Sequence, residues 1–248
     1  MLLLLVGCAD FLAISEAFDD LTNPLVVQSV YMGVEPLPPG VELGESAYAS
    51  GSTARVLLAD ASNVDELDEA PVITDATIVL EMEGGAVPLR AEAEGAWVAD
   101  TTDGLGWDAG DAVSLEVERE DGTHRLALVT PDAPKADIEA EQAKGEPLVV
   151  DLTGATYDNI VVTVVRLEDG ETVYDSMPTD IAALYRLTHA ADELVVEVPG
   201  SAFSKPGVYA VGVAGLVNAH PDDYEDVNVA LSALTAGSFV FSAVTVRP

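Results

Sequence analysis

From residue 25 onward, short stretches of apolar and β-branched residues alternate with turn-forming residues at intervals of about 10–15 residues. The clearest stretch is 113–118, where apolar and polar side chains alternate as they do in a strand with one buried face. Asp-Gly pairs at 121–122 and 169–170 predict hairpin turns, because this pair tolerates positive φ angles. The segments predicted as strands are 25–32, 54–59, 76–82, 86–91, 96–99, 112–118, 125–129, 147–152, 159–166, 172–174, 193–198, 207–216 and 238–246.

Short strands at this spacing favour an all-β fold of antiparallel sandwiches over a parallel α/β sheet. The 248 residues suit one large or two small domains. Two prolines within 131–134 stiffen the chain and predict a linker there. We therefore expect a first β-sandwich domain at 25–134 and a second at 135–248. The patterns at 181–188 and 226–234 fit a strand and a helical turn equally well.

In the second half, Pro206-Gly207 leads into an alternating strand that carries Tyr209. This pattern resembles the late strand of immunoglobulin-like sandwiches, in which a tyrosine often locks a corner. The Cys…Trp…Cys signature of true immunoglobulin domains is absent. The first half resembles, more loosely, the prealbumin-like or immunoglobulin-like modules of bacterial surface lipoproteins. The resemblance implies two immunoglobulin-like sandwiches and no particular ligand.

Residues 8–24 have a different character from the rest of the chain. Four large apolar residues within 9–22 fall near helical spacing and predict a short helix, which Asn23-Pro24 ends. Such a helix either stands the body of the protein off a membrane or packs on the first domain. The sequence leaves both alternatives open.

Cys8, the single cysteine, follows the apolar run 1–7. Leu5-Val6-Gly7-Cys8 resembles the lipobox of bacterial lipoproteins, which consists of an aliphatic residue, a variable residue, a small residue and an invariant cysteine. The resemblance implies that 1–7 is the remnant of a signal peptide, which is cut before Cys8, and that acyl chains on Cys8 anchor the protein. Two or three acyl chains suffice to hold a protein on a membrane, because each buried methylene contributes about 0.8 kcal/mol.

The apolar run 1–7 is shorter than a complete signal peptide, which has a basic segment and an apolar core of roughly 7–15 residues. We expect the missing part upstream of residue 1. The alternative is a short apolar N-terminus with a buried cysteine. By the family's sorting rule an aspartate directly after the cysteine favours inner-membrane retention. Because Ala9 stands there, we expect delivery to the outer membrane of a bacterial cell envelope, facing either the periplasm or the exterior.

The chain carries 44 acidic and 10 basic residues, a net charge of −34, and both halves are acidic. Phosphate backbones and anionic lipid surfaces need clustered Lys and Arg, so the composition excludes nucleic acid as a partner. An acidic surface poor in lysine is also typical of proteins from salty environments, in which case the charge serves solubility and implies no partner. With one cysteine, no disulfide forms within the chain.

Catalytic constellations are not recognisable in the sequence, so we expect no enzyme. The three histidines, His124, His189 and His220, are isolated, and we expect them to be solvated or capping residues. No nucleophile elbow or phosphate-binding glycine loop occurs. Trp97 and Trp107 are ten residues apart and are interpreted as core residues, with a ligand-facing pair as the alternative.

Calcium is the one ligand that the acidic loops suggest, because it binds several loop carboxylates and carbonyls. The loop 100–111 places Asp100, Asp103, Asp108 and Asp111 between flexible glycines and is the first candidate. The loops 60–69 and 221–228 carry similar clusters. None has the EF-hand pattern, and clusters arise by chance in so acidic a chain. We expect no cofactor, with calcium as the alternative.

These observations favour a non-enzymatic, membrane-anchored envelope lipoprotein that acts as a structural or interaction module. Its partner would be another envelope or extracellular protein. The alternative is an accessory lipoprotein, stabilised or not by calcium, that binds a glycan or peptide either at the crevice between the domains or on its loops. Exposed aromatic residues, Trp107, Tyr185 or Tyr224, lining one groove would favour that alternative. A hydrolase with an unrecognised carboxylate pair is the third hypothesis.

Overall fold

The computed structural model describes residues 25–44, 51–62, 69–92, 95–189, 194–221, 227–228 and 230–248. Cys8 and the helix predicted at 9–22 lie outside these ranges. Within them are one α-helix, α2 (Ile181–His189), and the 3-10 helices η3 (Thr101–Asp103) and η4 (Gly200–Phe203). The strands are β1 (Leu25–Val34), β2 (Thr53–Asp60), β3 (Thr77–Met82), β4 (Gly85–Pro88), β5 (Arg90–Ala91), β6 (Ala96–Asp100), β7 (Ala112–Arg119), β8 (Gly122–Val129), β9 (Glu141–Ala143), β10 (Leu148–Asp151), β11 (Asn159–Arg166), β12 (Glu171–Asp175), β13 (Val195–Val198), β14 (Gly207–Ala219) and β15 (Ala233–Arg247).

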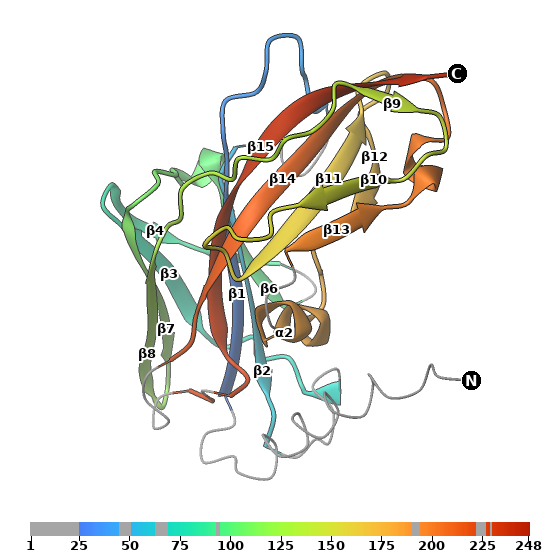
Figure 1. Ribbon diagram of the computed structural model, residues 1–248. Coiled ribbons are helices and arrows are strands. Elements are labelled where there is room, and N and C mark those ends of the chain that lie inside the picture. The colour runs from blue at the N-terminus through green and yellow to red at the C-terminus, as the bar shows by residue number, and fades with distance from the viewer. Residues whose placement is uncertain are drawn as a thin grey trace, which may run out of the picture.

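The largest sheet, called the central sheet below, has nine strands in the order β12-β11-β14-β15-β1-β2-β6-β5, with β9 paired to β15. Its longest ladder joins β14 and β15 without a register shift, from Gly207 opposite Val246 to Ala219 opposite Leu234. On its other edge, β15 pairs in parallel with β1 at one end and with β9 at the other. Strands from both sides of Pro134 therefore share this sheet (Figure 1).

Two smaller sheets pack on one face of the central sheet. Side chains two residues apart in a strand point to the same face. On β15, Leu234 and Ala236 belong to the core under the sheet β4-β3-β7-β8, whereas Val244 and Val246 belong to the core under β10-β13. All four residues lie at even positions of one unbroken strand. The two small sheets therefore cover the same face, one toward each end of β15.

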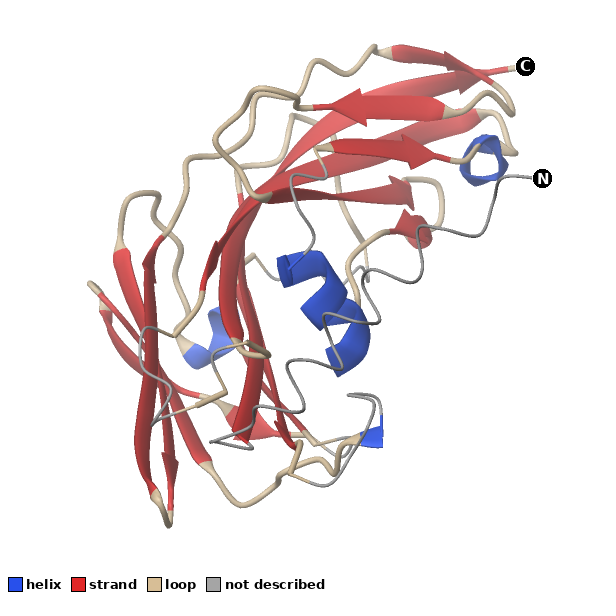
Figure 2. Ribbon diagram, turned by 60° about the horizontal axis from the view of Figure 1, so that its bottom comes forward, coloured by secondary structure: helices blue, strands red, loops and turns tan. Residues whose placement is uncertain are grey.

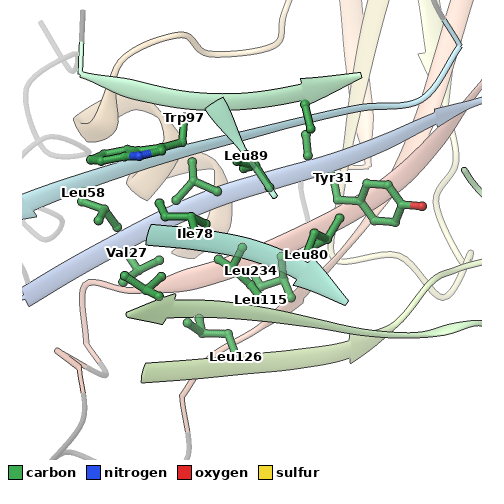
Figure 3. Packing of buried hydrophobic residues seen from close by; sticks show 14 of the residues in the cluster. Val27, Tyr31, Leu58, Ile78, Leu80, Leu89, Trp97, Leu115, Leu126 and Leu234 are labelled. Atoms are coloured by element: carbon green, nitrogen blue, oxygen red, sulfur yellow. The ribbon is translucent and has the colours of Figure 1, made fainter. Parts of the chain in front are cut away.

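The core under β4-β3-β7-β8 shows how the two layers interlock (Figure 3). Val27 and Tyr31 of β1 face Leu80 of β3 and Leu115 of β7, and Leu234 of β15 completes the cluster. Each of these side chains is at most 2% exposed. Full burial of such a side chain contributes roughly 1.5–3 kcal/mol. The alternation predicted at 113–118 thus places the apolar residues of β7 inside.

The opposite face of the central sheet carries α2 (Figure 2). Met32 of β1 and Phe239 and Phe241 of β15 pack in one cluster with Leu184 of the helix. The strand β14 makes room for these rings with Gly212, because a Cβ atom there would lie 2.5 Å from the Phe241 ring. One face thus bears two sheets, and the other bears a single described helix and neighbouring loop residues.

Residues 181–188, ambiguous in the sequence, form α2. Asp180 caps the helix, because its Oδ1 accepts a hydrogen bond from the Ala183 N–H at 2.7 Å. The apolar residues Ile181, Leu184 and Leu187 recur at a spacing of three and pack toward the central sheet. The cap and this apolar stripe explain why the helical alternative is correct.

The predicted fold class is confirmed at the level of architecture: the described chain is all-β, and its sheets pack face to face as sandwich layers. Tyr209 is fully buried, and its hydroxyl donates to the Lys205 carbonyl at 2.8 Å, which is the corner contact expected of it. The single strand predicted at 86–91 is wrong, because the chain breaks at Leu89 into β4 and β5 of different sheets. Leu89 fills the core between those sheets.

The division at residue 134 into two folding units stays a prediction, and the shared central sheet bears on it. We expect a fragment of residues 25–134 not to unfold cooperatively in urea. It lacks β15, so Leu234 and Ala236 are missing from its core and the edge of β1 is unpaired. Residues 25–248 are expected to show one cooperative transition by circular dichroism. A cooperative transition and dispersed amide NMR signals for the fragment alone would contradict this expectation.

Candidate binding pocket

The predicted calcium loop is divided into two pairs of carboxylates, of which Asp100 and Asp103 form the first. Asp100 caps η3, and its Oδ1 accepts from the Thr102 N–H at 2.7 Å. Arg90 of β5 forms ion pairs with both aspartates. Hydrogen bonds from Thr102, and then from Arg90, lower the pKa of Asp100. A guanidinium group therefore already supplies positive charge to this pair.

Asp108 and Asp111 form the second pair and flank a turn held by Thr130. The Thr130 hydroxyl donates to the Asp108 carbonyl at 2.6 Å and accepts from the Asp111 N–H at 3.0 Å. Burial first, and then the charges of Asp111 and Asp108, raise the pKa of Tyr31. The hydroxyl of Tyr31 donates to the carbonyl of Gly106 in the same loop.

Within the described ranges, no group of three or more His, Cys, Asp or Glu side chains is arranged to hold a metal ion. Calcium bound by the four aspartates of the loop 100–111 stays a prediction, and the contacts of Arg90 weigh against it. Most of the acidic residues in the loops 60–69 and 221–228 fall outside the described residues.

Trp107 and Tyr185, two of the aromatic residues that would favour a glycan or peptide site if they lined one groove, lie on opposite faces of the central sheet. Trp107 packs on Tyr31, with ring centroids 4.8 Å apart, against the core under β4-β3-β7-β8. Tyr185 of α2 is buried with Val26 on the opposite face of β1. Tyr224 lies outside the described residues. Trp97 is a core residue, as predicted, and is 3% exposed.

A pocket of about 350 Å³ opens on the face of the central sheet that carries α2. Residues of β1, β2, β5 and β6 line it from the sheet, and the link from β12 to α2 lines it from the other half of the chain. The pocket thus lies at the crevice between the two predicted domains. Its described lining residues are Val30, Met32, Thr53, Arg55, Arg90, Glu92, Val98, Ala99, Asp100, Asp175, Met177, Pro178, Thr179 and Leu184.

A row of directly opposite residues runs across the pocket. Val30 of β1 lies opposite Arg55 of β2, which lies opposite Val98 of β6, which lies opposite Arg90 of β5. Opposite residues share a face of the sheet, and neighbouring strands are about 4.8 Å apart. The backbones at Arg55 and Arg90 are therefore about 10 Å apart, with Val98 between them.

Among the described residues, Arg55 has no partner for its charge. Its Nε is buried without a hydrogen-bond acceptor, and among the described residues no carboxylate forms an ion pair with it. A buried donor left unsatisfied costs about 1–3 kcal/mol, and a charged group costs more. Arg186 is also unpaired but stands exposed on α2. The other arginines form ion pairs with described carboxylates: Arg90, Arg119, Arg125, Arg166 and Arg247.

None of the acidic residues among the described lining of the pocket forms an ion pair with Arg55. Asp100 is held by Arg90 and Thr102. Asp175 accepts a hydrogen bond from the Met177 N–H at 2.9 Å, which fixes the link between β12 and α2. Glu92 is exposed at the end of β5. The pocket therefore combines aliphatic walls, an unpaired guanidinium and carboxylates that do not neutralise it.

A second cluster of polar rings lies at the end of α2. The rings of His189 and Tyr185 stack with centroids 4.2 Å apart, and the His220 ring lies 4.6 Å from that of His189. His189 is half-buried at the C-terminal end of α2, and its Nδ1 lies 3.0 Å from the Tyr185 carbonyl, which fits the predicted capping role. The expectation of a solvated or capping residue is wrong for His124, which is 5% exposed and has its Nε2 3.3 Å from an Asp121 carboxylate oxygen. Burial, and then the charge of His220, lower the pKa of His189 to about 4.

Arg55 is not among the site residues predicted from the sequence. The available signal was its position, because Arg55 is the first basic residue of the chain and stands inside an apolar strand. A charged residue between buried neighbours needs a partner or faces a pocket. Which of the two applies depends on the strands and the link that surround it, and these come from distant parts of the sequence.

Comparisons with known proteins do not assign the chain to a family. No protein-family model matches it, and no curated protein matches it. Among solved structures, the titin domains Z1Z2 in complex with telethonin match at 13% identity and a TM-score of 0.20, covering 92% of this chain and 96% of theirs. A Ca²⁺-stabilised adhesin from an Antarctic bacterium matches at 17% identity and a TM-score of 0.21, covering 91% of this chain and 49% of its own.

The N-terminal four immunoglobulin domains of Dscam1 match at 12% identity and a TM-score of 0.17, covering 90% of this chain and 65% of theirs. Similarities at these TM-scores say nothing about ligands or partners, and the fold follows from the sheets themselves. Within the described ranges, none of the helices has the length and apolar character required to cross a membrane.

We expect the low pKa of His189 to make the protein less stable as the pH falls from 6.5 to 4. Its folded pKa lies below its unfolded value of about 6.5, so the unfolded state binds the proton first. The stability due to neutral His189 is complete above pH 6.5 and decreases by on the order of 3 kcal/mol toward pH 4. This decrease is measured by urea unfolding of the wild type and of His189→Gln at several pH values.

Because carboxylates titrate in the same pH range, the quantity that tests the prediction is the difference in unfolding free energy between the wild type and His189→Gln. The His189→Gln variant should show a shallower dependence of unfolding free energy on pH between 4.5 and 6.5. Equal slopes for the two proteins would mean that His189 ionises normally in the folded state.

Proposed function

We propose that this protein is a membrane-anchored binding module of a bacterial cell envelope. Acyl chains on Cys8 hold it on the membrane, and the pocket on the central sheet binds a small ligand. The anchor follows from the lipobox Leu5-Val6-Gly7-Cys8. The binding role is supported by the pocket on the face of the central sheet that lies opposite the two small sheets.

One observation carries the binding role: among the residues that the structure describes, the half-buried Arg55 has no counter-ion, although the chain is strongly acidic. A volume of about 350 Å³ falls within the range of ligand pockets, about 300–1,000 Å³. Such pockets have mostly apolar walls and a few polar groups that orient the ligand. Val30, Val98 and Leu184 supply the walls here, and Arg55 supplies the orienting group.

The alternatives have less support. A glycan site needs exposed aromatic faces, and no aromatic side chain is among the described lining residues of the pocket. A hydrolase that uses two carboxylates needs one of them with a raised pKa. Among the described carboxyl groups, every resolved pKa shift is downward, as it is for Asp60, Asp100, Asp121, Asp151 and Asp169. Binding without catalysis is therefore the function that we propose.

The anchor is tested by metabolic labelling with a clickable fatty acid, with the native upstream sequence present. We expect label on the wild type and none on Cys8→Ala, because the cysteine thiol is the acylation site in lipoproteins. Protease shaving of intact cells then distinguishes the exterior from the periplasm. Label on both proteins, or on neither, would contradict the anchor.

The pocket is tested with the fluorescent dye 8-anilinonaphthalene-1-sulfonate, which has an apolar body and one negative charge. We expect saturable binding to the wild type. Val98→Trp should weaken binding at least ~10-fold, because the larger side chain fills the space between Arg55 and Arg90. Val149→Trp is the matched control, since Val149 is 56% exposed on β10 and away from the pocket.

The control should bind the dye as the wild type does, and circular dichroism should confirm that both variants are folded. Equal dye affinity for the wild type and a folded Val98→Trp variant would show that the pocket is not the binding site.

A further inference from the structure

We propose that the pocket selects a small amphipathic monocarboxylate, whose carboxylate pairs with Arg55 and whose aliphatic body lies against Val98, Met177 and Leu184. This assignment rests on the proposed function, because it names the ligand class of the same pocket. It goes beyond that function in stating which charge, shape and surface the ligand must have.

The head group follows from the guanidinium of Arg55. Arginine presents N–H donors in a planar fork that matches the two oxygens of a carboxylate. The Nε donor of Arg55 is buried without an acceptor. A ligand carboxylate that reaches the fork would satisfy this donor, which no described side chain of the protein does.

The number of negative charges on the ligand follows from the other charged residues at the pocket. Arg90, the other arginine at the pocket, is already paired with Asp100 and Asp103. The pocket therefore offers one uncompensated positive charge. Glu92 and Asp175, which also line the pocket, add negative potential. A dianion such as a phosphate monoester would carry a second charge with no partner, so the balance favours a single negative charge.

The body of the ligand follows from the walls, which are aliphatic or thioether side chains: Val30, Met32, Val98, Met177 and Leu184. Methionine side chains are unbranched and adapt their shape to an apolar neighbour. Flat rings and sugars gain most from aromatic faces, and the described lining supplies none. A volume of about 350 Å³ is at the lower end of the range for ligand pockets, which favours a free acid of medium length over a polypeptide segment.

The test compares octanoate with octanamide, which has the same chain and a neutral head, by isothermal titration calorimetry on the full-length protein in 0.15 M salt. We expect octanoate to bind the wild type at least ~10-fold more tightly than octanamide, because charged hydrogen bonds are stronger than neutral ones. Arg55→Met should remove that preference and keep the binding of octanamide. Retained octanamide binding shows that the pocket of this variant is intact.

Two further variants sharpen the comparison. Arg186→Met removes an exposed arginine of α2 that is not among the lining residues, so it should keep the full preference for octanoate. Arg55→Lys keeps the charge and loses the fork, so its preference should be intermediate.

The possible failures are distinguishable. Equal affinity for octanoate and octanamide, together with dye binding that Val98→Trp abolishes, would overturn the carboxylate assignment and leave the binding role. An unchanged octanoate preference in Arg55→Met would overturn the role of Arg55. Tighter binding of an acetylated dipeptide ending in leucine than of octanoate would overturn the small-acid assignment. No binding of dye or octanoate would remove the proposed binding role with it.

Discussion

The rest of the structure depends on the pairing of β15. This strand hydrogen-bonds to β14 along its length and to β1 and β9 at its two ends. Because its alternation is unbroken, the residues that enter the two sandwich cores lie on one face of the strand. The two small sheets must therefore pack on the same side of the central sheet. The two halves of the chain therefore share the central sheet, in addition to being connected at Pro134.

The pocket follows from this arrangement. With both small sheets on one face, the other face must be covered by what remains of the chain. The nine residues of α2 extend about 14 Å, whereas the eight strands in the main path of the central sheet extend about 34 Å across. One short helix cannot cover that width. The helix covers Phe239 and Phe241, and the region of β2, β6 and β5 beside it is left with Val98 and Arg55 facing a cavity.

The elements with a clear local pattern could be predicted from the sequence, and the site could not. The alternation in β7 and the corner at Tyr209 are local features, so their residues identify them. The parallel pairing of β1 with β15 joins residues about 200 positions apart. The break at Leu89 depends on the different partners of its two sides, because β4 pairs with β3 and β5 pairs with β6. The partners of the aspartates in the loop 100–111 come from other parts of the chain, because Arg90 lies in β5 and Thr130 directly follows β8. Arg55 could not be identified as a site residue from the sequence either, because the residues that surround it come from distant parts of the chain.

The large negative charge of the chain restricts which anions can bind at the unpaired Arg55. An anion approaching a surface of net charge −34 is repelled, although salt screens this repulsion beyond about 8–10 Å. A small hydrophilic anion gains too little at one guanidinium to offset both that repulsion and the loss of its own hydration. An anion with an aliphatic body gains, in addition, the burial of that body against Val98 and Leu184. The charge of the protein and the walls of the pocket therefore act together: the first excludes most anions, and the second selects the amphipathic ones.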